Sequence, residues 1–520
     1  MINKIKLTII KNFLFHIYLF NKKKKHKIRD YEYNFENIIF VNLEDARKKF
    51  LLNKRFKNNE IEKDFSFHFF DWLIAAKIIG GAESVSRAKK NILRWHIKKY
   101  KKNHLIWSSI FVSRRFTNLL YNYDFYAVSA SISEKKVLHE IILEHYLLIR
   151  LELQTNTENI DIENFKSFFL GSLIYNENIN SSLKLLSYLI FNQIDKYGLH
   201  KSYNPLEQAK FLNHLQQIKN MILFFKLQVP DDLSFQILNL TSTLLSLIHK
   251  DRSLPLFNGA NNMYNEKVEA LANQEKDVVS KNLNKINNGL AIYNDKSKKI
   301  IMDVVRPTNN IINKNLHAST LAFEFSCMGE KIITNCGSIE KKIGDTPEYL
   351  RFSAAHSTII LNNTNISELV LKKSYKRIPK KIIFSKDEDK SYINWHASHD
   401  GYLQNFYKII KRKISISKNT NKIIGEDSII TNKINEKKNF FSIRFHLMPD
   451  CNCLITNDHY SVIIKTKKGQ NWIFKSDSKI YLEDSIYIGK GKLVEQNKQI
   501  VINGAVHDTK IIKKWSLTQS

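Results

Sequence analysis

The spacing of apolar residues changes once along this chain, and the change divides it into two halves that cannot share one architecture. From about residue 64 to 250, apolar residues recur at helical spacing, whereas from about residue 286 they alternate within short runs. A helix buries side chains with a period of about 3.6 residues and a strand with a period of about two. We therefore predict a helical domain followed by a β domain, which suits a length of 520 residues.

The first half contains several amphipathic helices. Five apolar residues that follow Pro205 lie on one face of a single predicted helix: Phe211, Leu215, Ile218, Ile222 and Phe225. The same spacing predicts helices over residues 134–153, 164–174, 181–194 and 234–249, separated by short polar breaks. Short connections favour antiparallel helix pairs, and hence a bundle, a solenoid or a toroid.

The second half consists of short β-rich runs bounded by Gly, Asn and Asp. The predicted strands lie at residues 291–293, 299–305, 321–325, 331–334, 357–361, 441–447, 460–465, 472–474, 480–488 and 499–502. Many short strands without intervening helices predict an antiparallel sandwich. The predicted organisation is a lead-in at 1–63, a helical domain at 64–255, a polar linker at 256–285 and a β-sandwich domain at 286–520.

The net charge of +31, from 81 basic and 50 acidic residues, has two explanations. A basic chain suits a polyanionic partner such as nucleic acid, an anionic membrane or an acidic polysaccharide. Alternatively, the charge reflects general enrichment in Lys, which accompanies abundant Asn and Ile in the products of AT-rich genomes. Only 14 of the basic residues are Arg, the side chain that nucleic-acid readers prefer, and no nucleic-acid motif is present. We therefore expect no nucleic-acid partner.

The N-terminal residues 1–28 combine an apolar stretch with a basic run. The apolar part, residues 7–20, is interrupted by polar residues and is shorter than the about 20 apolar residues that span a bilayer. It also lacks the uninterrupted apolar centre and the small-residue cleavage site of a signal peptide. We predict a basic amphipathic helix that lies on protein or makes peripheral contact with an anionic membrane, and no transmembrane segment.

Several stretches resemble the heparinase II/III-like family of polysaccharide lyases. In the β half they are LHASTLAFEF at 316–325 with IITNCG at 332–337, YLRFSAAHST at 349–358, and ASHDGY at 397–402 with GED at 425–427 and IRFHL at 443–447. In the helical half, GLHKSYNP at 198–205 and LFNGA at 256–260 resemble pieces of the same family. The resemblance extends from about residue 65 to 515 and is densest between 286 and 450.

This resemblance implies an N-terminal α/α-toroid followed by a C-terminal antiparallel β-sandwich. It also implies an enzyme, a lyase that cleaves an acidic, uronate-containing polysaccharide by β-elimination. That reaction requires the uronate carboxylate to be neutralised, so that the C5 proton becomes acidic. A base must then remove the proton, and an acid must protonate the leaving glycosidic oxygen. The family further implies a bacterial cell envelope or periplasm, with the cytoplasm as the alternative because no clear signal peptide is seen.

The resemblance assigns catalysis to one loop of the helical half and one residue of the β half. Asn204 matches the family position near the substrate carboxylate, although an Asn before Pro, with Glu three residues on, is also a typical helix N-cap. His200 and Tyr203 lie in the same loop and are candidate acid/base groups, with plain surface positions as the alternative. His317 is the fourth catalytic candidate.

His317 also matches one of the family's metal ligands. The other ligand positions correspond to Asn335, with Cys336 beside it, and to His356. Two His and a Cys would suit zinc, whereas Asn is a weak replacement for a carboxylate. The alternative is that both His are packed side chains without a metal. The four Cys form no CxxC pair, so neither a zinc ribbon nor a disulfide scaffold is expected.

The chain departs from the family pattern at positions tied to proton transfer. The first His and the Asp of the family's His-x-His-x-Asp pattern are Asn315 and Ser319 here, and a Tyr-His pair of the family is replaced by Glu207 and Gln208. Two candidate proton-transfer residues are therefore missing. This leaves two functions open, an active lyase and a catalytically degenerate relative that binds a glycan in envelope or exopolysaccharide metabolism.

Arg351 and His399 are the predicted substrate-binding residues. An Arg side chain binds a carboxylate through two parallel hydrogen bonds, and the alternative for Arg351 is a buried ion pair that holds its loop to the sandwich. His399 also remains a candidate for catalysis, but its strand-like context, like that of His446, is typical of a packed His.

Overall fold

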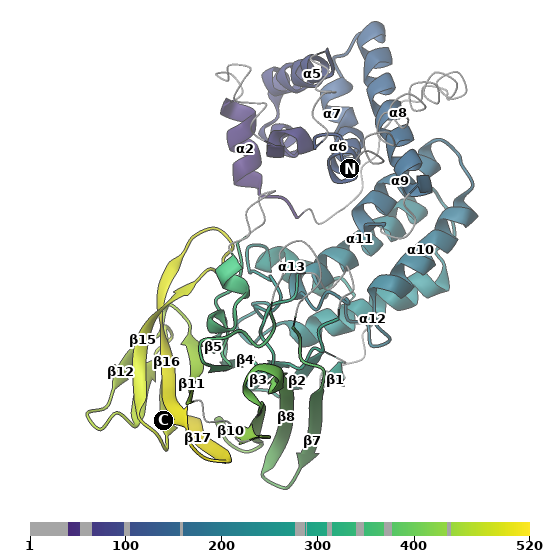
Figure 1. Ribbon diagram of the computed structural model, residues 1–520. Coiled ribbons are helices and arrows are strands. Elements are labelled where there is room, and N and C mark those ends of the chain that lie inside the picture. Colours follow the sequence, from purple (N-terminus) through teal and green to yellow (C-terminus); the bar gives the residue numbers. More distant parts are fainter. Residues whose placement is uncertain are drawn as a thin grey trace. The chain divides into compact units, whose positions relative to one another are not determined.

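The computed structural model describes residues 40–52, 65–97, 105–155, 160–275, 286–287, 289–308, 315–339, 348–368, 377–433 and 438–520. The basic segment at 1–28 lies outside these residues. The chain divides into two compact units (Figure 1). The helical unit comprises Met1–Phe191 and Asn213–Ser234, and the β unit comprises Asn192–Leu212 and Phe235–Ser520. In the described stretches, no helix is both long enough and apolar enough to cross a membrane.

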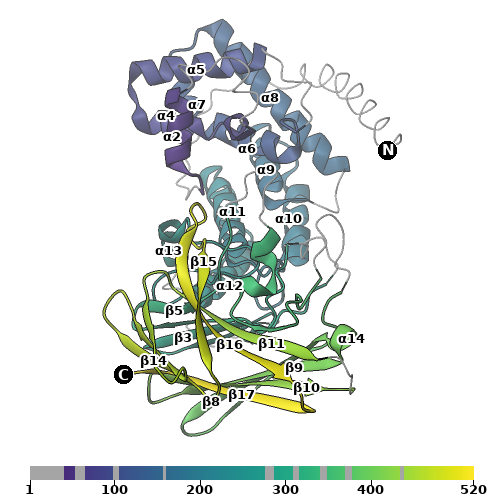
Figure 2. The ribbon, with the colours of Figure 1, turned by 60° about the vertical axis from the view of Figure 1, so that its left-hand side comes forward.

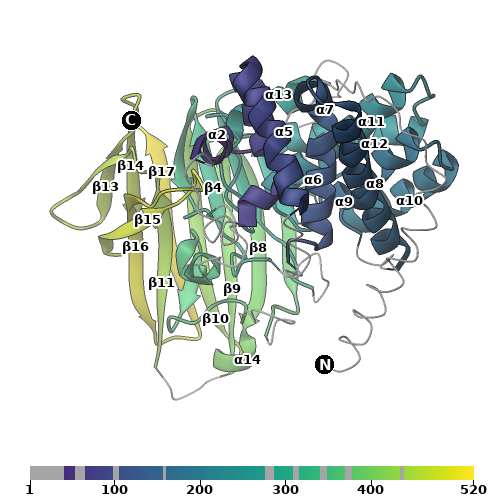
Figure 3. The ribbon, with the colours of Figure 1, turned by 90° about the horizontal axis from the view of Figure 1, so that it is seen from above.

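The predicted helices are confirmed by the structure. In chain order the α-helices are α2 (Leu43–Leu52), α4 (Trp72–Ile79), α5 (Gly81–Ile97), α6 (Ser109–Tyr121), α7 (Tyr123–Ala127), α8 (Ile132–Thr155), α9 (Ile162–Ile174), α10 (Ile179–Gln193), α11 (Pro205–Phe224), α12 (Asp231–Leu247) and α13 (Asn265–Asn273). Within the helical unit, α6, α8 and α9 pack against one another (Figure 3). Their buried faces carry the apolar residues that gave the helical period, such as Phe116, Leu147 and Phe169.

Two antiparallel sheets form the β domain (Figure 2). The first has the order β1-β2-β3-β4-β5-β11-β16-β15, with β6 paired to β11, and the second has the order β12-β13-β14-β17-β10-β9-β8-β7. The strands are β1 (Ile286–Asn287), β2 (Leu290–Asn294), β3 (Lys298–Asp303), β4 (Phe323–Cys327), β5 (Glu330–Thr334), β6 (Ile359–Leu361), β7 (Ile382–Glu388), β8 (Tyr392–Tyr402), β9 (Lys408–Ser417), β10 (Lys422–Thr431), β11 (Asn439–Leu447), β12 (Asn452–Ile455), β13 (Ser461–Lys465), β14 (Asn471–Ser476), β15 (Ile480–Tyr487), β16 (Glu495–Val506) and β17 (Lys510–Gln519).

One apolar core joins the inner faces of the two sheets, as in a sandwich. Phe323 and Phe445 from the first sheet meet Trp515 from the second, and the rings of Phe323 and Trp515 stack with centroids 5.6 Å apart. The buried ion pair of Arg412 and Asp427 joins the neighbouring strands β9 and β10 on the inner face of the second sheet, and Arg412 also donates to the carbonyl oxygens of Leu321 and Ser357.

The other face of the first sheet is covered by elements that precede it in the chain. Leu199, Leu247 and Phe257 form a second buried cluster with residues of β2 and β3 and with Ala322, just before β4. The start of the predicted linker at 256–285 therefore belongs to the packed interior of the β unit, since Phe257 is fully buried. This packing brings the loop before α11 to the edge of the sheet, where the candidate site lies.

Candidate functional site

Asn258 joins the two parts of the chain that carry the predicted catalytic residues. Its side-chain Oδ1 accepts a hydrogen bond from the backbone N–H of His317 (3.1 Å), and its Nδ2 donates to the carbonyl oxygen of Tyr203 (3.0 Å). Its own carbonyl oxygen accepts from Nδ2 of Asn204 (3.0 Å). Asn258 has a φ of 53°, a conformation that Asn tolerates better than most residues. One residue thus sets the distance between the loop at 198–204 and His317.

Asn204 is the N-cap of α11, as its position before Pro205 predicted. Its Oδ1 accepts from the backbone N–H groups of Leu206 (2.8 Å) and Glu207 (3.3 Å). The cap does not exclude the second role predicted for Asn204, because the cap uses the oxygen and a substrate carboxylate would use the nitrogen. One N–H of Nδ2 is taken by Asn258, and the second has no partner in the described part of the chain.

His317 and His356 face each other. Nδ1 of His317 lies 3.3 Å from Nε2 of His356, and both side chains are buried. Burial lowers the pKa of His356 to about 3, further lowered by His446 and only partly offset by Glu324, so this ring is neutral at pH 7. Nδ1 of His356 is buried and makes no hydrogen bond with the described residues.

Gly259 separates Asn204 from His317. A Cβ atom at residue 259 would lie 3.5 Å from Nδ2 of Asn204 and 3.7 Å from Nε2 of His317. Because Gly259 has a φ of 90°, a side chain would also be strained there. An amide N–H donor and an imidazole nitrogen therefore flank the same glycine, where no side chain intervenes.

The other two predicted catalytic residues are packed away from this pair. His200 is buried against the ring of Phe211 and its Nδ1 is 2.7 Å from Oγ of Ser202, while burial lowers its pKa to about 4. The ring of Tyr203 packs so closely on Gly289 that a Cβ there would lie 2.4 Å from it. Burial, and then Asp195 and Asp303, raise the pKa of Tyr203. Both side chains therefore support the loop rather than the reacting groups.

The predicted substrate-binding residues are also not placed together. Arg351 donates to the carbonyl oxygen of Leu316, next to His317, and its own carbonyl accepts from the N–H of Ala318. Arg351 thus holds the segment that carries His317. This is close to the alternative role predicted for Arg351, which was to hold its loop through an ion pair, but here the bonds go to backbone atoms. His399 is 1% exposed, and its Nδ1 accepts from the N–H of Gly401. The substrate-binding and catalytic roles of His399 stay predictions.

The four predicted zinc ligands do not converge. Only His317 and His356 are adjacent, whereas the amide of Asn335 donates to Glu324 and accepts from the N–H of Ser357. Sγ of Cys336 instead lies 3.7 Å from Nδ1 of His446, and burial raises its pKa to about 12, so it is a neutral thiol. Within the described ranges, no group of three or more His, Cys, Asp or Glu is placed to hold a metal ion. These residues therefore do not fit the predicted zinc site.

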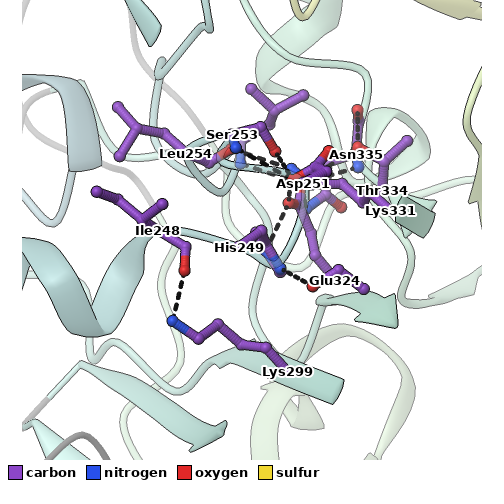
Figure 4. Close-up of polar contacts among 12 residues, drawn as sticks. Ile248, His249, Asp251, Ser253, Leu254, Lys299, Glu324, Lys331, Thr334 and Asn335 are labelled. Carbon is purple, nitrogen blue, oxygen red and sulfur yellow. Dashed lines mark hydrogen bonds and ion pairs between the residues drawn. The ribbon is translucent and has the colours of Figure 1, made fainter. Parts of the chain in front are cut away.

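A buried carboxylate, Glu324, anchors the segment that carries Asn258 (Figure 4). Its Oε1 accepts from the N–H of Leu256 (3.0 Å) and from Nδ2 of Asn335 (3.1 Å), and its Oε2 lies 2.8 Å from Nζ of Lys331 and 3.3 Å from Nε2 of His249. Burial would raise the pKa of Glu324, but Lys331 and His249 outweigh it and lower the pKa to about 2. Glu324 is therefore ionised and fully paired.

Asn258 and Glu324 were not predicted as functional residues. Both lie in stretches that resemble the family, but neither has a role that its own neighbours in sequence reveal. The Asn-Gly pair at 258–259 and a charged residue inside the apolar strand at 321–325 are the signals that could have pointed to them.

Comparisons with known proteins show which fold and which family the chain resembles. Residues 286–516 match the family described as heparinase II/III-like, C-terminal. A crystal structure of heparinase III is 13% identical with a TM-score of 0.70, covering 98% of this chain and 89% of that chain. The heparan sulfate lyase HepC from Pedobacter heparinus is 13% identical with a TM-score of 0.61, covering 97% of this chain and 87% of that chain.

A curated relative extends the similarity at the level of sequence. FtsZ-localized protein C of Caulobacter vibrioides is 23% identical over 475 residues, which cover 88% of this chain and 81% of that protein. At these identities the solved structures establish the fold, and the family match applies to the β domain. Residues 286–516 match the heparinase II/III-like family, and the helical region followed by two antiparallel sheets is the fold of heparinase III.

Proposed function

We propose that this chain is a polysaccharide lyase that cleaves an acidic, uronate-containing polysaccharide by β-elimination. The observation that carries the proposal is that Nδ2 of Asn204 and Nε2 of His317 both lie beside Gly259. An amide N–H can stabilise the carboxylate as charge develops on it, and an imidazole can exchange the proton. Polymers of this kind occur in the cell envelope, which we propose as the location.

The proton transfers would depend on one imidazole. Nε2 of His317 removes the proton from C5, the C4–C5 double bond forms as the C4–O4 bond breaks, and the resulting imidazolium returns the proton to O4. Base and acid can be the same group when both act on one face of the sugar ring. Charge and protons then balance without a further residue, which suits a chain with Asn315 and Glu207 at the family's other positions.

His356 would select the reactive tautomer of His317. A neutral His356 that accepts a hydrogen bond from the Nδ1–H of His317 leaves Nε2 of His317 with the lone pair that a base needs. The protonated nitrogen of His356 is then Nδ1, the buried atom without a described partner.

The test measures the ultraviolet absorbance of the new double bond while purified protein is incubated with alginate, polygalacturonate, hyaluronan and heparan sulfate. We expect activity on at least one polymer, and a loss of about 100-fold or more in His317→Gln because a general acid/base group is removed. The matched control is His507→Gln, a change at an exposed His, which should leave the rate unchanged. A folded wild-type protein that yields no absorbance with any of these polymers would overturn the proposal.

A second candidate, binding of the polysaccharide without cleavage, is favoured by the residues that replace the family's Tyr-His pair. Glu207 pairs with Lys210 (3.0 Å), and Gln208 is buried, bonding the backbone of His200, Gly198 and Leu240. Both positions thus have structural roles here. In this case the polymers bind without absorbance, and Asn204→Ala weakens binding while His317→Gln does not.

The similarity to FtsZ-localized protein C supports a further candidate, association with FtsZ, because it covers most of both chains. Co-sedimentation of the purified protein with FtsZ would test it. His317→Gln should not change the sedimented fraction, which separates this role from polysaccharide cleavage.

A further inference from the structure

The outward face of the eight-stranded sheet carries four lysines on three of the four neighbouring strands β14, β17, β10 and β9. They are Lys475 of β14, Lys514 of β17, and Lys411 and Lys413 of β9, together the lysine face. The residues that alternate with them, such as Phe474, Trp515 and Ile414, lie in the apolar core between the sheets. Because successive side chains of a strand point to opposite faces, the four lysines share the face turned away from that core.

The register of the strands places these lysines close together. Lys514 is opposite Glu426 of β10, which is opposite Lys413, so the two lysines are two strands or about 10 Å apart. Lys475 is opposite Ser516, two residues from Lys514, and is therefore its diagonal neighbour at about 7–8 Å. Lys411 lies two residues before Lys413 on β9, about 7 Å away. The ammonium groups thus form one patch rather than isolated charges.

The lysine face has charge that the protein itself does not neutralise. Among the residues described by the structure, no ion pair joins any of the four lysines to a carboxylate, and none joins Glu426 to Lys413 or Lys514. The outward rows hold a second carboxylate, Asp387 of β7, which pairs with His396 (2.7 Å), the residue opposite Lys413. The hydrogen bond from Asn394, and then His396 and the charge of Lys413, lower the pKa of Asp387. Four ammonium groups therefore share these rows with two carboxylates, Glu426 and Asp387.

Short polar side chains fill the spaces between the lysines. Ser415 and Asn394 lie in the same outward row as Lys475, and Oγ of Ser415 donates to Oδ1 of Asn394 (2.7 Å). Ser428 of β10 and Ser398 of β8 lie opposite Lys411, one on each side of it. Hydroxyl and amide groups of this kind can bond to the hydroxyl groups of a sugar chain, while the lysines bind its carboxylates.

We infer that the lysine face is a second binding surface for an acidic polysaccharide, distinct from the Asn204–His317 site. The choice of polymer rests on the proposed function, whereas the surface itself rests on register and charge. Single-stranded nucleic acid would require aromatic side chains for stacking, and a membrane would require a band of apolar side chains. The outward rows that carry the lysines instead consist of Lys, Ser, Asn, His, Glu and Asp with single Ile residues.

The test compares two triple variants with the same change in net charge. Lys411→Gln/Lys475→Gln/Lys514→Gln removes three exposed lysines of the lysine face, and Lys90→Gln/Lys136→Gln/Lys184→Gln removes three exposed lysines of helices α5, α8 and α10. Binding to polygalacturonate is measured at low salt by calorimetry, with melting temperature as the check on folding. We expect the first variant to lose about tenfold in affinity, the sum of three exposed charge contacts, and the second to change less than twofold.

Equal loss in the two variants would overturn the inference, because it would mean that net charge alone attracts the polymer. Loss of binding only to duplex DNA, or only to phosphatidylglycerol vesicles, would also overturn it and assign the face to that partner. The proposed function is separated by a third arm. His317→Gln should keep the binding that depends on the lysine face, so a chain that never cleaves the polymer can still confirm the second surface.

Discussion

At the scale of single residues, Asn258 holds the candidate site together, although sequence reasoning pointed to the residues around it. Its side-chain amide bonds the backbone at Tyr203 and at His317, and its main-chain carbonyl oxygen accepts from Nδ2 of Asn204, so three candidate residues are tied to this one residue. Asn258→Gly keeps the positive φ but removes both side-chain bonds. We expect it to lower the free energy of unfolding by about 1–3 kcal/mol, because two buried backbone groups lose their partners.

The same variant should act on the site. Since the side chain of residue 258 would no longer tie the backbone of His317 to that of Tyr203, next to Asn204, turnover should fall more than binding, and KM should change little. Asn258→Asp, which keeps the acceptor for the N–H of His317, should recover part of the loss. A variant that loses stability but keeps full turnover would contradict the positioning role.

Gly259 offers a more selective probe of the space between the two polar groups. Gly259→Ala places a methyl group within 4 Å of both Nδ2 of Asn204 and Nε2 of His317, and adds backbone strain because φ is 90°. Gly469→Ala is the matched control, with a φ of 85° and no atom within 4 Å of the new methyl group. Both should cost about 1–2 kcal/mol in stability, while only Gly259→Ala should reduce polysaccharide binding or cleavage. Equal function in the two variants would show that no ligand occupies this space.

At the scale of elements, the Glu324 network ties β4 and β5 to the end of α12 and the segment that follows it. Lys331 bonds both Glu324 and the carbonyl oxygen of Leu254. Lys299 bonds the carbonyl oxygen of Ser246 in the last turn of α12 and that of Ile248 just after it, and Figure 4 shows the bond to Ile248. Burial lowers the pKa of Lys299 to about 7. Charged side chains thus satisfy backbone carbonyls that the helix end leaves open.

A double-mutant cycle measures how much the pair of Glu324 and Lys331 contributes to the free energy of unfolding. Glu324→Gln should destabilise the protein by about 3–5 kcal/mol, because it leaves Lys331 charged and buried. Lys331→Met should be similar alone, and the double variant should lose much less than the sum of the two. Asp484→Asn, which breaks an exposed ion pair with Lys498 (2.6 Å), should cost less than about 1 kcal/mol. Additive effects of Glu324→Gln and Lys331→Met in urea unfolding would show that the pair is not coupled.

Periodicity predicted most elements because it records which face of each element is buried. It gave α8, α9, α11 and α12 within a few residues, and ten strands. It did not give the long strands β8, β9, β10 and β17, whose outward rows are Ser, Asn and Lys and whose inward rows include the polar Arg412 and Asp427.

The candidate site was predictable only where its chemistry is local. The cap made by Asn204 involves residues two and three positions away, so sequence reasoning found it. The bonds of Asn258, and those of Glu324 to Leu256 and His249, join residues 54 to 75 positions apart, and these partners follow from the fold alone. The same reason explains why four predicted zinc ligands, although correctly ordered along the chain, do not meet.

At the scale of the whole molecule, buried histidines set the dependence of stability on pH. Burial is the main cause of a lowered pKa in His200, His249 and His446, each about 4, and in His356 and His399, each about 3. In the unfolded chain these groups titrate near 6.5. Between the two values the unfolded state binds more protons, so the stability they contribute is full above pH 6.5 and is lost as pH falls toward 4.

We therefore expect the free energy of unfolding to fall steeply between pH 6.5 and 4.5, by up to about 1.4 kcal/mol per pH unit for each such histidine. Asp303 opposes this in part, because burial raises its pKa to about 6, so its contribution rises as pH falls from about 6 toward 4. Urea unfolding at pH 7.5, 6.0 and 5.0 measures the slope, and His399→Gln should reduce it by one proton. Constant stability over this range would contradict the assignment.

The edges of the eight-stranded sheet have a consequence for handling the protein at high concentration. β12 has four residues, and β7 ends in the exposed charges Lys386, Asp387 and Glu388. Short or charged edge strands discourage pairing with the sheet of another molecule. Replacing these three charges with Thr would leave a long edge that includes the exposed Ile383, and we expect light scattering of that variant to rise with concentration well before the wild type.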